Sequence, residues 1–454
     1  MKCYSARYCM VILLSFALAI IYGLKVNYHV AVVAMVNHTA LAIQEGRNKS
    51  AEAGEEDGPY IWSPTVRGLQ LSAYFWGYMA AQLPGGRMAE DYSAKWVYLF
   101  AVAINVVFTL LTPLLSAISS WAVVVVRVMQ GIGGGMSFPA THVMLARWSP
   151  PTERSIMSSI AYCGTAAGTV LFTLLSGFIA HGLGWQWVFY LEGGFSALWI
   201  LFWVIFASDF PEKQKFISAE EKAFIIESFK EEGGGEGHGK MKIPWRAIFT
   251  SLPFWAIIVA HTCSNWGWYM VLIELPTYMK DVLNFNIQEN ASLSSVPYLC
   301  MFIFSLILGK TIDVLRVKGK ISTTFGRKAA TFIASFFPCA CFAALCFIVK
   351  PTPAVVLMTL SIMCIGGMYC GFLSNHIDIS PNFAGTLMAI TNTIATIPGI
   401  VVPIFVGWLT EKDPSIASWR TVFFVTMGLY VLEIIFYLLF ASGNEQSWNR
   451  AEGR

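Results

Sequence analysis

Two basic side chains and a histidine lie inside apolar stretches of this chain, where charged groups are rare. Lys25 stands in the middle of YGLKVNYHVAVVAMVN (22–37), and His29 follows four residues later, on the same face of a helix. Arg127 opens a second apolar stretch, RVMQGIGGGMSFPATH (127–142). A charged side chain in such a position faces a hydrated interior and marks a candidate site for ions or substrates. Because both charged groups are basic and few acids lie at comparable depth, the sequence predicts a site for an anion.

The stretch after Arg127 is rich in glycine, with Gly131, Gly133 and Gly135 at alternating positions. Glycine lowers helix propensity, so this density indicates close approach of a neighbouring helix or backbone that lines a cavity. Two structural alternatives stay open. Arg127 could pair only with main-chain carbonyls of a neighbouring helix, and Lys25 could extend to the outer surface, because it lies in the outer half of its stretch.

Polar residues at helical spacing occur in further apolar stretches. Tyr74 and Tyr78 share one face of a helix, and Asn265 lies in another stretch together with His261 and Trp268. A single polar side chain in a membrane helix often serves only to join two helices, but stripes on several helices are better explained by a shared, hydrated cavity. The candidate substrate-binding residues are therefore Lys25, Arg127, Tyr74, Tyr78 and Asn265.

The elements that position these residues are membrane-spanning helices. Of the 454 residues, 56% are hydrophobic and 13% are charged, and the mean hydropathy is +0.59. Soluble proteins usually carry roughly a quarter charged residues, and apolar stretches of about 20 residues, long enough to cross a bilayer, recur along the chain. The expected spans are 10–34, 65–85, 97–117, 121–145, 158–180, 187–207, 252–275, 293–312, 329–349, 354–375, 385–409 and 419–441.

The predicted fold class is therefore all-α: a polytopic membrane protein with 12 transmembrane helices in two six-helix halves. The longest polar stretch separates the halves, and its glycine-rich end indicates a flexible linker. The expected domains are an N-terminal six-helix bundle at 1–207, a cytosolic linker at 208–250, a C-terminal six-helix bundle at 251–441 and a short cytosolic tail at 442–454.

Lysine and arginine are unevenly distributed between the two sets of loops. With the N-terminus in the cytosol, most of them fall on the cytosolic side, as the positive-inside rule requires, and both termini are then cytosolic. The three N-x-[ST] sequons, at Asn37, Asn48 and Asn290, all fall in loops on the opposite side, where glycosylation takes place.

A short motif recurs six spans apart. Gly86 precedes Glu90 in GGRMAEDYSAK (85–95), and Gly309 precedes Asp313 in GKTIDVLRVKGK (309–320). In both copies the acid lies at the predicted cytosolic end of a helix and basic residues follow. The recurrence indicates a parallel internal repeat, as in transporters built from two similar halves. We expect these four residues to form a conformational latch between helices.

Other classes of site find little support. The sequence contains no zinc-ligand spacing, nucleophile elbow, phosphate-binding loop or paired carboxylates, so we expect no catalytic site, no metal site and no enzyme activity. The net charge of +3 is spread over many short loops and gives no indication of nucleic-acid binding. Most of the ten cysteines lie in or beside apolar runs, and we expect no disulfide framework.

Longer strings of the chain resemble one family. Besides 22–37, they are YFWGYMAAQLPGG (74–86), HVMLARWSPPTERS (142–155), GWQWVFYLEG (184–193), SLPFWAIIVAH (251–261) and NHIDISPNFAGTLMAITNTIATIPGIVVP (375–403). Together they are similar to the anion:cation symporters of the major facilitator superfamily, which include sialin, the vesicular glutamate transporters and the type I sodium–phosphate cotransporters, with the greatest similarity to invertebrate candidate inorganic phosphate cotransporters. The resemblance implies a twelve-helix carrier that works by alternating access.

The resemblance also implies roles for single residues. The family usually has arginine at the position of Lys25, where it is implicated in binding the substrate anion. Lysine keeps this charge but loses the planar fork that suits carboxylate and phosphate. Arg127 matches an arginine implicated in transport, and His142 matches a histidine usual in the family.

Two departures from the family bear on coupling. A glutamate linked to proton coupling in the sialin and vesicular glutamate branches is replaced here by Gly134, and an arginine of the vesicular glutamate branch is replaced by Ser264. Proton coupling through that acid is therefore excluded, glutamate loading is disfavoured, and sodium coupling gains support. His29, whose imidazole titrates near neutral pH, and His142 are the candidates for coupling.

These expectations describe a secondary active transporter of small anions, either inorganic phosphate or organic carboxylates, coupled to sodium or protons. The expected partners are the anion, the coupling cation and the lipid bilayer; we expect no cofactor and no nucleic acid, and a monomer suffices. A non-transporting anion sensor or scaffold on the same fold and an anion channel are the alternatives. The tails contain no acidic dileucine signal, which favours the plasma membrane over a lysosomal or vesicular membrane.

Overall fold

The computed structural model describes residues 5–37, 39–40, 43, 58–231, 242–274, 278, 287–348, 350–410 and 416–450. Nearly all of these residues are helical, and the only extended pairing among them is an isolated bridge between Val36 and Tyr60. The nine cysteines in these ranges are free. The predicted all-α fold class is confirmed.

Six long helices form the N-terminal half of the molecule. They are α1 (Ala6–Met35), α3 (Pro64–Met88), α4 (Ala94–Ile118), α5 (Ser120–Trp148), α6 (Arg154–Leu183) and α7 (Trp185–Phe206). A π-helical turn, Ala89–Ser93, joins α3 to α4 without a loop. The Ser119 hydroxyl accepts a hydrogen bond from the main-chain N–H of Ala122 and so caps α5.

The C-terminal half repeats this arrangement after two shorter helices, α8 (Ala219–Glu231) and α9 (Trp245–Thr250). Its long helices are α10 (Leu252–Tyr269), which continues as the π-helical segment Met270–Glu274, α12 (Ile287–Val317), α13 (Thr323–Leu345), α14 (Pro351–Ile365), α16 (Ala384–Thr410) and α17 (Ile416–Phe440), and the short α15 (Phe372–Ile379) follows α14.

Each of the predicted spans corresponds to one of these helices, with one difference. The span expected at 354–375 is interrupted: α14 ends at Ile365, and a 3₁₀ turn separates it from α15. Glycines allow other helices to approach the interrupted segment closely. A Cβ at Gly366 would lie 3.0 Å from the main-chain oxygen of Met301, and one at Gly367 would lie 2.8 Å from that of Ala330. Neighbouring helices therefore pack directly against this backbone.

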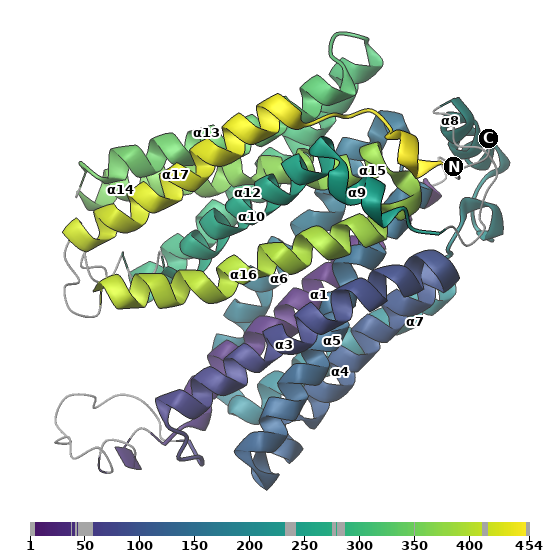
Figure 1. Ribbon diagram of the computed structural model, residues 1–454. Coiled ribbons are helices and arrows are strands. Elements are labelled where there is room, and N and C mark those ends of the chain that lie inside the picture. Colours follow the sequence, from purple (N-terminus) through teal and green to yellow (C-terminus); the bar gives the residue numbers. More distant parts are fainter. Residues whose placement is uncertain are drawn as a thin grey trace.

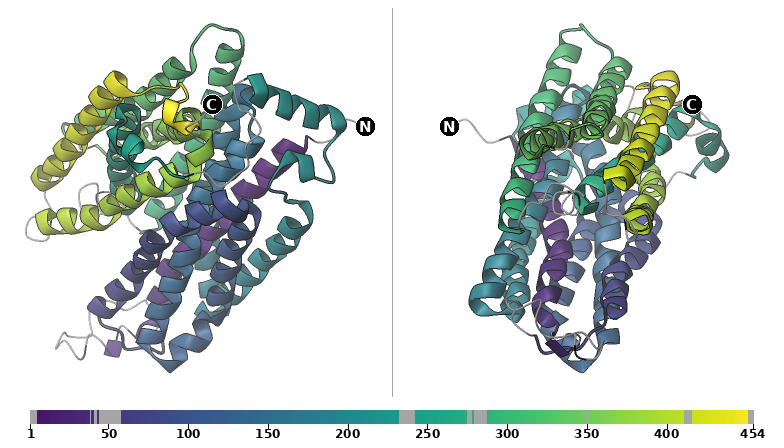
Figure 2. Two further views of the ribbon diagram at one scale, coloured as in Figure 1. Left: turned by 45° about the vertical axis from the view of Figure 1, so that its right-hand side comes forward. Right: turned by 90° about the vertical axis from the view of Figure 1, so that its left-hand side faces the viewer.

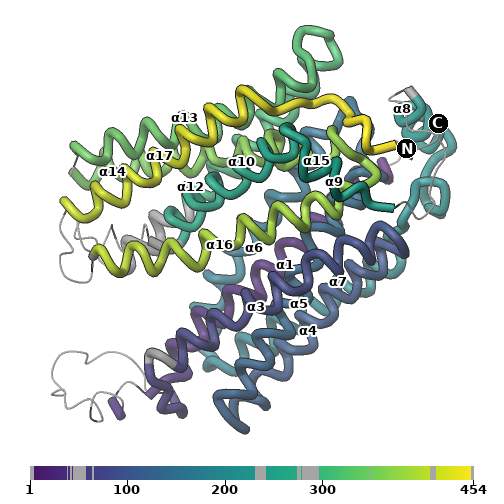
Figure 3. Tube along the Cα trace, viewed as in Figure 1, coloured from purple at the N-terminus to yellow at the C-terminus, as the bar shows by residue number. Residues whose placement is uncertain are grey.

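The two halves meet at one end of the molecule and diverge toward the other (Figure 1). The chain ends and α8 lie at the end where the halves meet, and both views of Figure 2 and the trace in Figure 3 agree on this placement. We call this end, which the sequence predicts to be cytosolic, the inner end, and the opposite end the outer end. Between the halves, α16 packs against α3 and α5, and α12 packs against α6. The largest cluster of buried apolar side chains runs through both halves.

Candidate functional site

Lys25 lies in the outer half of α1, and its ammonium faces α3. Its Nζ atom lies 5.3 Å from the ring centroid of Tyr22, 5.2 Å from that of Tyr74 and 4.6 Å from that of Phe75. Aromatic faces stabilise an ammonium but do not neutralise it. The side chain is half-buried, and no described carboxylate pairs with it. The ammonium therefore lies inside the N-terminal half, which contradicts the alternative in which it extends to the outer surface.

Arg127, on α5, lies next to the same tyrosine ring. Its guanidinium carbon is 5.1 Å from the ring centroid of Tyr74 and 4.8 Å from that of Tyr28. The side chain is fully buried; Nη1 donates to Gln130 Oε1 at 2.9 Å, Nη2 donates to the main-chain carbonyl of Lys25 at 3.2 Å, and Nε has no partner. The carbonyl contact is the one that the structural alternative predicted, but it leaves the charge of Arg127 without a counter-ion among the described residues.

The two basic residues that the sequence singled out thus both lie beside the ring of Tyr74. Two like charges in a protein interior repel each other, and burial adds a desolvation cost to each. An anion between or beside them would remove both penalties. The planar guanidinium suits carboxylate and phosphate oxygens, and the ammonium supplies a second, less directional charge.

The glycines of α5 explain how Arg127 reaches this position. A Cβ at Gly131 would lie 2.0 Å from the main-chain oxygen of Tyr74, and one at Gly135 would lie 2.2 Å from that of Tyr78. The predicted close helix approach is therefore present, between α3 and α5. At Gly134 an added Cβ would lie 2.0 Å from the hydroxyl of Tyr74, so this arrangement of the tyrosine leaves no room for a side chain at that position.

The remaining predicted site residues divide between two places. Tyr78 is buried beside Tyr74, and its hydroxyl accepts a hydrogen bond from Asn392 Nδ2, on α16 of the other half, at 2.9 Å. Asn265, on α10, donates instead to the main-chain oxygen of Ala395 at 2.9 Å. In the described part of the chain no contact joins Asn265 to either basic residue. Its observed role is to connect α10 to α16.

The two candidate coupling histidines also lie apart. His29 follows the lysine of α1 by one turn and is exposed. His142 is fully buried: its Nε2 donates to the main-chain carbonyl of Leu373, in the other half, at 2.9 Å, and its Nδ1 contacts the hydroxyl of Tyr162. The ring of His376 lies 5.1 Å from that of His142. His142 therefore belongs to the contact between the halves and not to the pair of basic residues.

The first copy of the predicted latch motif connects α3 to α16. Glu90 accepts hydrogen bonds from the main-chain N–H of Thr386 at 2.6 Å and from its hydroxyl at 2.5 Å, while Arg87 pairs with the same carboxylate at 2.7 Å. A Cβ at Gly86 would lie 2.8 Å from the main-chain oxygen of Gly385. The carboxylate thus satisfies the N-terminal turn of a helix in the opposite half, where a negative charge is stabilised.

The second copy makes the corresponding contact between α12 and α6. Asp313 accepts from the main-chain N–H groups of Ser155 at 3.3 Å and Ile156 at 2.8 Å, again at a helix N-terminus in the opposite half. A Cβ at Gly309 would lie 2.7 Å from the hydroxyl of Ser159. Both copies therefore join the halves at the inner end by the same device.

A buried ion pair between the halves was not identified from the sequence. Asp378 pairs with Arg327 of its own half at 2.5 Å and with Arg154 of the other half at 2.9 Å, and all three side chains are about 1% exposed. An acid inside an apolar run is itself a signal for a partnered charge, but the sequence does not indicate the partners, which lie far apart along the chain.

The described polar contacts between the halves extend from the inner end to the level of Tyr78 and Asn392. Lys25 and His29 lie nearer the outer end of α1 than this level, and His29 is exposed. The molecule is therefore closed at its inner end. Lys25 and Arg127 lie on the outer side of this closure.

The three sequons lie at the outer end or outside the described residues. Asn37 follows the end of α1 and accepts a hydrogen bond from the main-chain N–H of Ala40 at 2.7 Å. Asn48 lies outside the described residues. Asn290 belongs to the first turn of α12, which begins at Ile287 and so earlier than the span expected from 293. Glycosylation at these positions stays a prediction.

Comparison with known proteins places this geometry in a family. The sequence model of the Major Facilitator Superfamily matches residues 4–403. The chain belongs to the Major Facilitator Superfamily. Sialin of Homo sapiens is 38% identical over 458 residues, which cover 98% of this chain and 91% of the relative. A Drosophila melanogaster protein named "Putative inorganic phosphate cotransporter" is 35% identical, covering 99% and 88%, and human vesicular glutamate transporter 2 is 34% identical, covering 97% and 75%.

Solved structures show the same superfamily fold. A proton:xylose symporter of this superfamily superposes with a TM-score of 0.73 at 14% identity, covering 97% of this chain and 98% of the other. The human organic anion transporter MFSD10 gives a TM-score of 0.67 at 13% identity, covering 95% and 99%. The predicted twelve-helix superfamily fold and the resemblance to the anion:cation symporters are confirmed. This major facilitator protein is therefore an integral, multi-pass membrane protein and not an enzyme.

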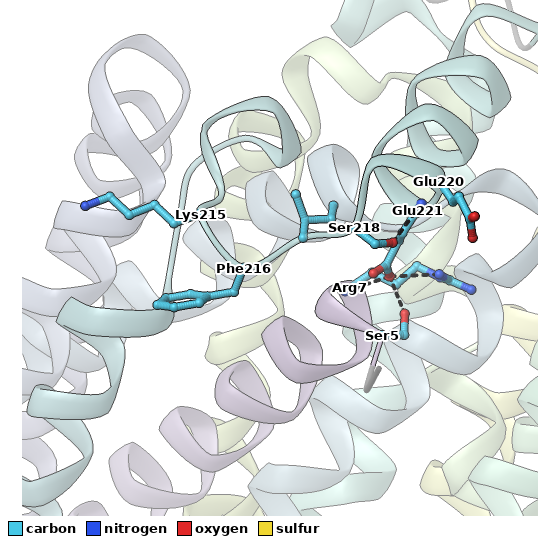
Figure 4. Close-up of a pocket in the computed structure, with 8 residues that line it drawn as sticks. Ser5, Arg7, Lys215, Phe216, Ser218, Glu220 and Glu221 are labelled. Carbon is cyan, nitrogen blue, oxygen red and sulfur yellow. Dashed lines mark hydrogen bonds and ion pairs between the residues drawn. The ribbon is translucent and has the colours of Figure 1, made fainter. Parts of the chain in front are cut away.

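One surface pocket of this major facilitator protein lies at the inner end, away from the basic pair. Figure 4 shows Glu221 of α8 directed at the start of α1, where it accepts hydrogen bonds from the hydroxyl of Ser5, the main-chain N–H of Ala6 and the guanidinium of Arg7. Arg7 also pairs with Glu153 at 2.7 Å. Glu153 and Glu221 already neutralise Arg7, so this pocket is not a candidate anion site. Its contacts hold α8 against the N-terminal half.

Proposed function

We propose that this protein is a secondary active transporter of small anions, with inorganic phosphate or an organic carboxylate as its substrate and Na⁺ or H⁺ as the coupled ion. The observation that carries the proposal is the pair of Lys25 and Arg127, two cations without a described counter-ion on the outer side of the closure between the halves. The named substrates of related proteins, phosphate and glutamate, are both anions.

The transport cycle follows from where the halves touch. An anion entering from the outer end would bind between the basic residues while the inner end is closed. Release at the inner end then requires that the contacts of Glu90, Asp313 and Asp378 with the opposite half break together. These contacts join nearly rigid bundles at one end, so their loss would allow the bundles to rock about the level of the bound anion.

The coupled ion, the monomeric state and the membrane of residence belong to the proposal. His29 is exposed beside the basic pair and is the candidate for proton coupling, while the replacement of the family glutamate by Gly134 favours Na⁺. His142 is tied to the other half and would act through the closure. We propose the plasma membrane as the location, which surface labelling of intact cells would test.

The test is uptake of labelled phosphate, glutamate, sialic acid and urate into cells that express the protein, with and without Na⁺ and across a pH step. We expect saturable uptake of one anion that depends on a cation gradient and is lost in Lys25→Ala. Lys350→Ala, which removes an exposed lysine just before α14, is the matched control and should behave as the wild type.

Three results would contradict the proposal. Binding of an anion without flux would indicate a sensor. Electrogenic flux that does not saturate would indicate a channel. Uptake equal to that of mock-transfected cells for every anion, at confirmed surface expression, would remove the assigned role of Lys25.

A further inference from the structure

A carboxyl group is also buried in the N-terminal half, and neither Lys25 nor Arg127 pairs with it. Glu192 lies on α7 and is 3% exposed. Its Oε1 accepts a hydrogen bond from the hydroxyl of Ser176, on α6, at 2.8 Å, and the amide of Asn27, on α1, is its other polar neighbour. No lysine, arginine or histidine in the described ranges pairs with this carboxyl.

Two other buried oxygen atoms without partners belong to residues near this carboxyl, Oδ1 of Asn27 and Oγ of Ser196. Asn27, on α1, is fully buried, and its amide lies within hydrogen-bonding reach of the Glu192 carboxyl. Ser196 follows Glu192 by one turn of α7, so it lies on the same face, and its buried hydroxyl also lacks a partner. The carboxyl of α7 thus has polar groups of α1 and α6 beside it, and Ser196 lies on its own face of α7.

A lone carboxylate and several unpaired polar groups are costly in a protein interior. A proton on Glu192 would remove the charge but would satisfy at most one acceptor, leaving the carbonyl oxygen of Asn27 or the hydroxyl oxygen of Ser196 without a partner. A hard cation takes several oxygen ligands at once, carboxylate, amide carbonyl and hydroxyl included. One carboxylate balances one positive charge, which suits a monovalent ion. A divalent ion would add to the excess of positive charge that Lys25 and Arg127 already give this half.

We propose that Glu192, Asn27, Ser176 and Ser196 form a Na⁺ site between α1, α6 and α7. The inference rests on the proposed function, for which it supplies the coupled ion. Asn27 lies two residues after Lys25 on α1, and the carbonyl of Lys25 is tied to Arg127. A cation that holds Asn27 therefore fixes the segment of α1 that carries one of the two anion-binding charges. It also neutralises the buried acid, which repels an incoming anion.

Linkage gives this arrangement a quantitative consequence. If Na⁺ raises the affinity for the anion by some factor, the anion raises the affinity for Na⁺ by the same factor. The site lies wholly within the N-terminal half, so its ligands do not separate when the two halves move. Na⁺ binding can therefore be measured without transport and without the anion.

The experiment is thermal unfolding of the purified full-length protein in lipid nanodiscs, without any transported anion, as Na⁺ replaces choline at constant ionic strength. We expect Tm to rise with Na⁺ and to saturate, and K⁺ to have much less effect. Glu192→Gln should raise the half-saturating Na⁺ concentration by about tenfold or more, which corresponds to about 1.4 kcal/mol of binding free energy. Ser196→Ala, a milder change in case Glu192→Gln does not fold, should raise it by a smaller factor.

The matched control is Glu433→Gln. Glu433 is a fully buried carboxyl of the other half, on α17, that accepts a hydrogen bond from Ser264 at 3.2 Å and likewise has one oxygen without a partner. This variant should keep the wild-type response to Na⁺. The proposal is overturned if the wild type does not respond to Na⁺, if Glu192→Gln or Ser196→Ala responds as the wild type does, or if Glu433→Gln alone abolishes the response.

A pH series separates the Na⁺ site from a simple protonated carboxyl. If lowering the pH raises Tm to the same extent and Na⁺ adds nothing, Glu192 is a proton site and the Na⁺ proposal is wrong. The same experiments distinguish a failure of the Na⁺ site from a failure of the proposed transport function. A saturable Na⁺ response in a protein that transports no anion would retain the site and reject the transporter, and anion uptake without any Na⁺ response would do the reverse.

Discussion

Nη2 of Arg127 donates a hydrogen bond to the main-chain carbonyl of Lys25, 3.2 Å away. The contact uses the side chain of one residue and the backbone of the other, so it does not depend on the lysine side chain. Substitution of Lys25 therefore removes a charge and leaves α1 attached to α5, whereas substitution of Arg127 removes a charge and an attachment. The two positions should respond differently to mutation.

Lys25→Gln should lower the apparent affinity for the anion by about tenfold or more, because one charge-assisted interaction is worth about 1.5–3 kcal/mol, while Tm stays near that of the wild type. Lys25→Arg should keep transport. Arg127→Gln should lower both transport and Tm, since Gln130 and the carbonyl of Lys25 lose their donor. Uptake kinetics and thermal unfolding check these outcomes together. A wild-type KM in Lys25→Gln would show that its charge does not contact the anion.

Gly134→Ala should impair folding or transport, because the added Cβ would lie 2.0 Å from the hydroxyl of Tyr74. Adding Tyr74→Phe removes that oxygen, and the double variant should recover part of the loss. Gly177→Ala is the control: it lies in α6 with no atom within 4 Å of the added Cβ, and alanine there should be neutral or slightly stabilising. Yield of folded protein and thermal unfolding are the measurements. Equal behaviour of the two alanine variants would contradict the close packing of α3 on α5.

Glu90→Gln and Asp313→Asn should weaken the closure at the inner end, because each carboxylate accepts hydrogen bonds from a helix N-terminus of the other half. The native thiol of Cys163, which is buried against Ser305 between α6 and α12, reports the opening. In a protein whose other cysteines are serine, maleimide labelling of Cys163 should become several-fold faster. Asp91→Asn is the control, since Asp91 pairs with Arg87 of its own half. Equal labelling rates in all variants would reject the latch.

The attachment of α8 to α1 should depend on pH. Burial raises the pKa of Glu221, but hydrogen bonds from Ser5, Ala6 and Arg7 outweigh it and hold the pKa below its ordinary value. A lowered pKa means that the ionised carboxylate stabilises the folded state at neutral pH, and that this contribution is lost as the pH falls through and below about 4.

Hydrogen exchange of residues 219–231 checks this dependence. We expect slow exchange at pH 7 and, after correction for intrinsic rates, faster exchange in acid. Glu221→Gln should exchange quickly at both pH values, while Glu220→Gln, which changes an exposed neighbour, should follow the wild type. Slow exchange in Glu221→Gln at pH 7 would show that α8 is held in another way.

The sequence was sufficient for features that repeat or that depend on local composition. Length, hydropathy and basic residues in alternate loops predicted the helices, and the recurrence of Gly86 with Glu90 and Gly309 with Asp313 predicted contacts that the structure contains. The shared site of Lys25 and Arg127 followed from their charge, because charged side chains in membrane helices face the bundle interior or a water-filled cavity.

Features that depend on which helices touch could not be predicted. Asp378 meets Arg154 and Arg327 only because α15 lies at the junction of the halves. Glu192 lies more than one turn inside α7 and is buried because α1 and α6 cover it, which its place in the sequence does not indicate. Asn265 shares the spacing of a cavity-facing residue but is used to join α10 to α16. The spacing of residues in the sequence shows which residues share a face of a helix, but it does not show which helix packs against that face.

Main-chain contact between α3 and α5, made possible by Gly131 and Gly135, has a consequence for the direction of transport. Tyr74 and Arg127 are therefore held in a single rigid body, so the guanidinium keeps its place beside the tyrosine ring while the halves move. The cargo would remain seated on the same two cations while the C-terminal half alternately covers its inner and outer faces. The affinity of the two cations for the anion would then be similar in the outward-facing and inward-facing states. The net flow must therefore be set by the gradients of the anion and of the coupled ion together.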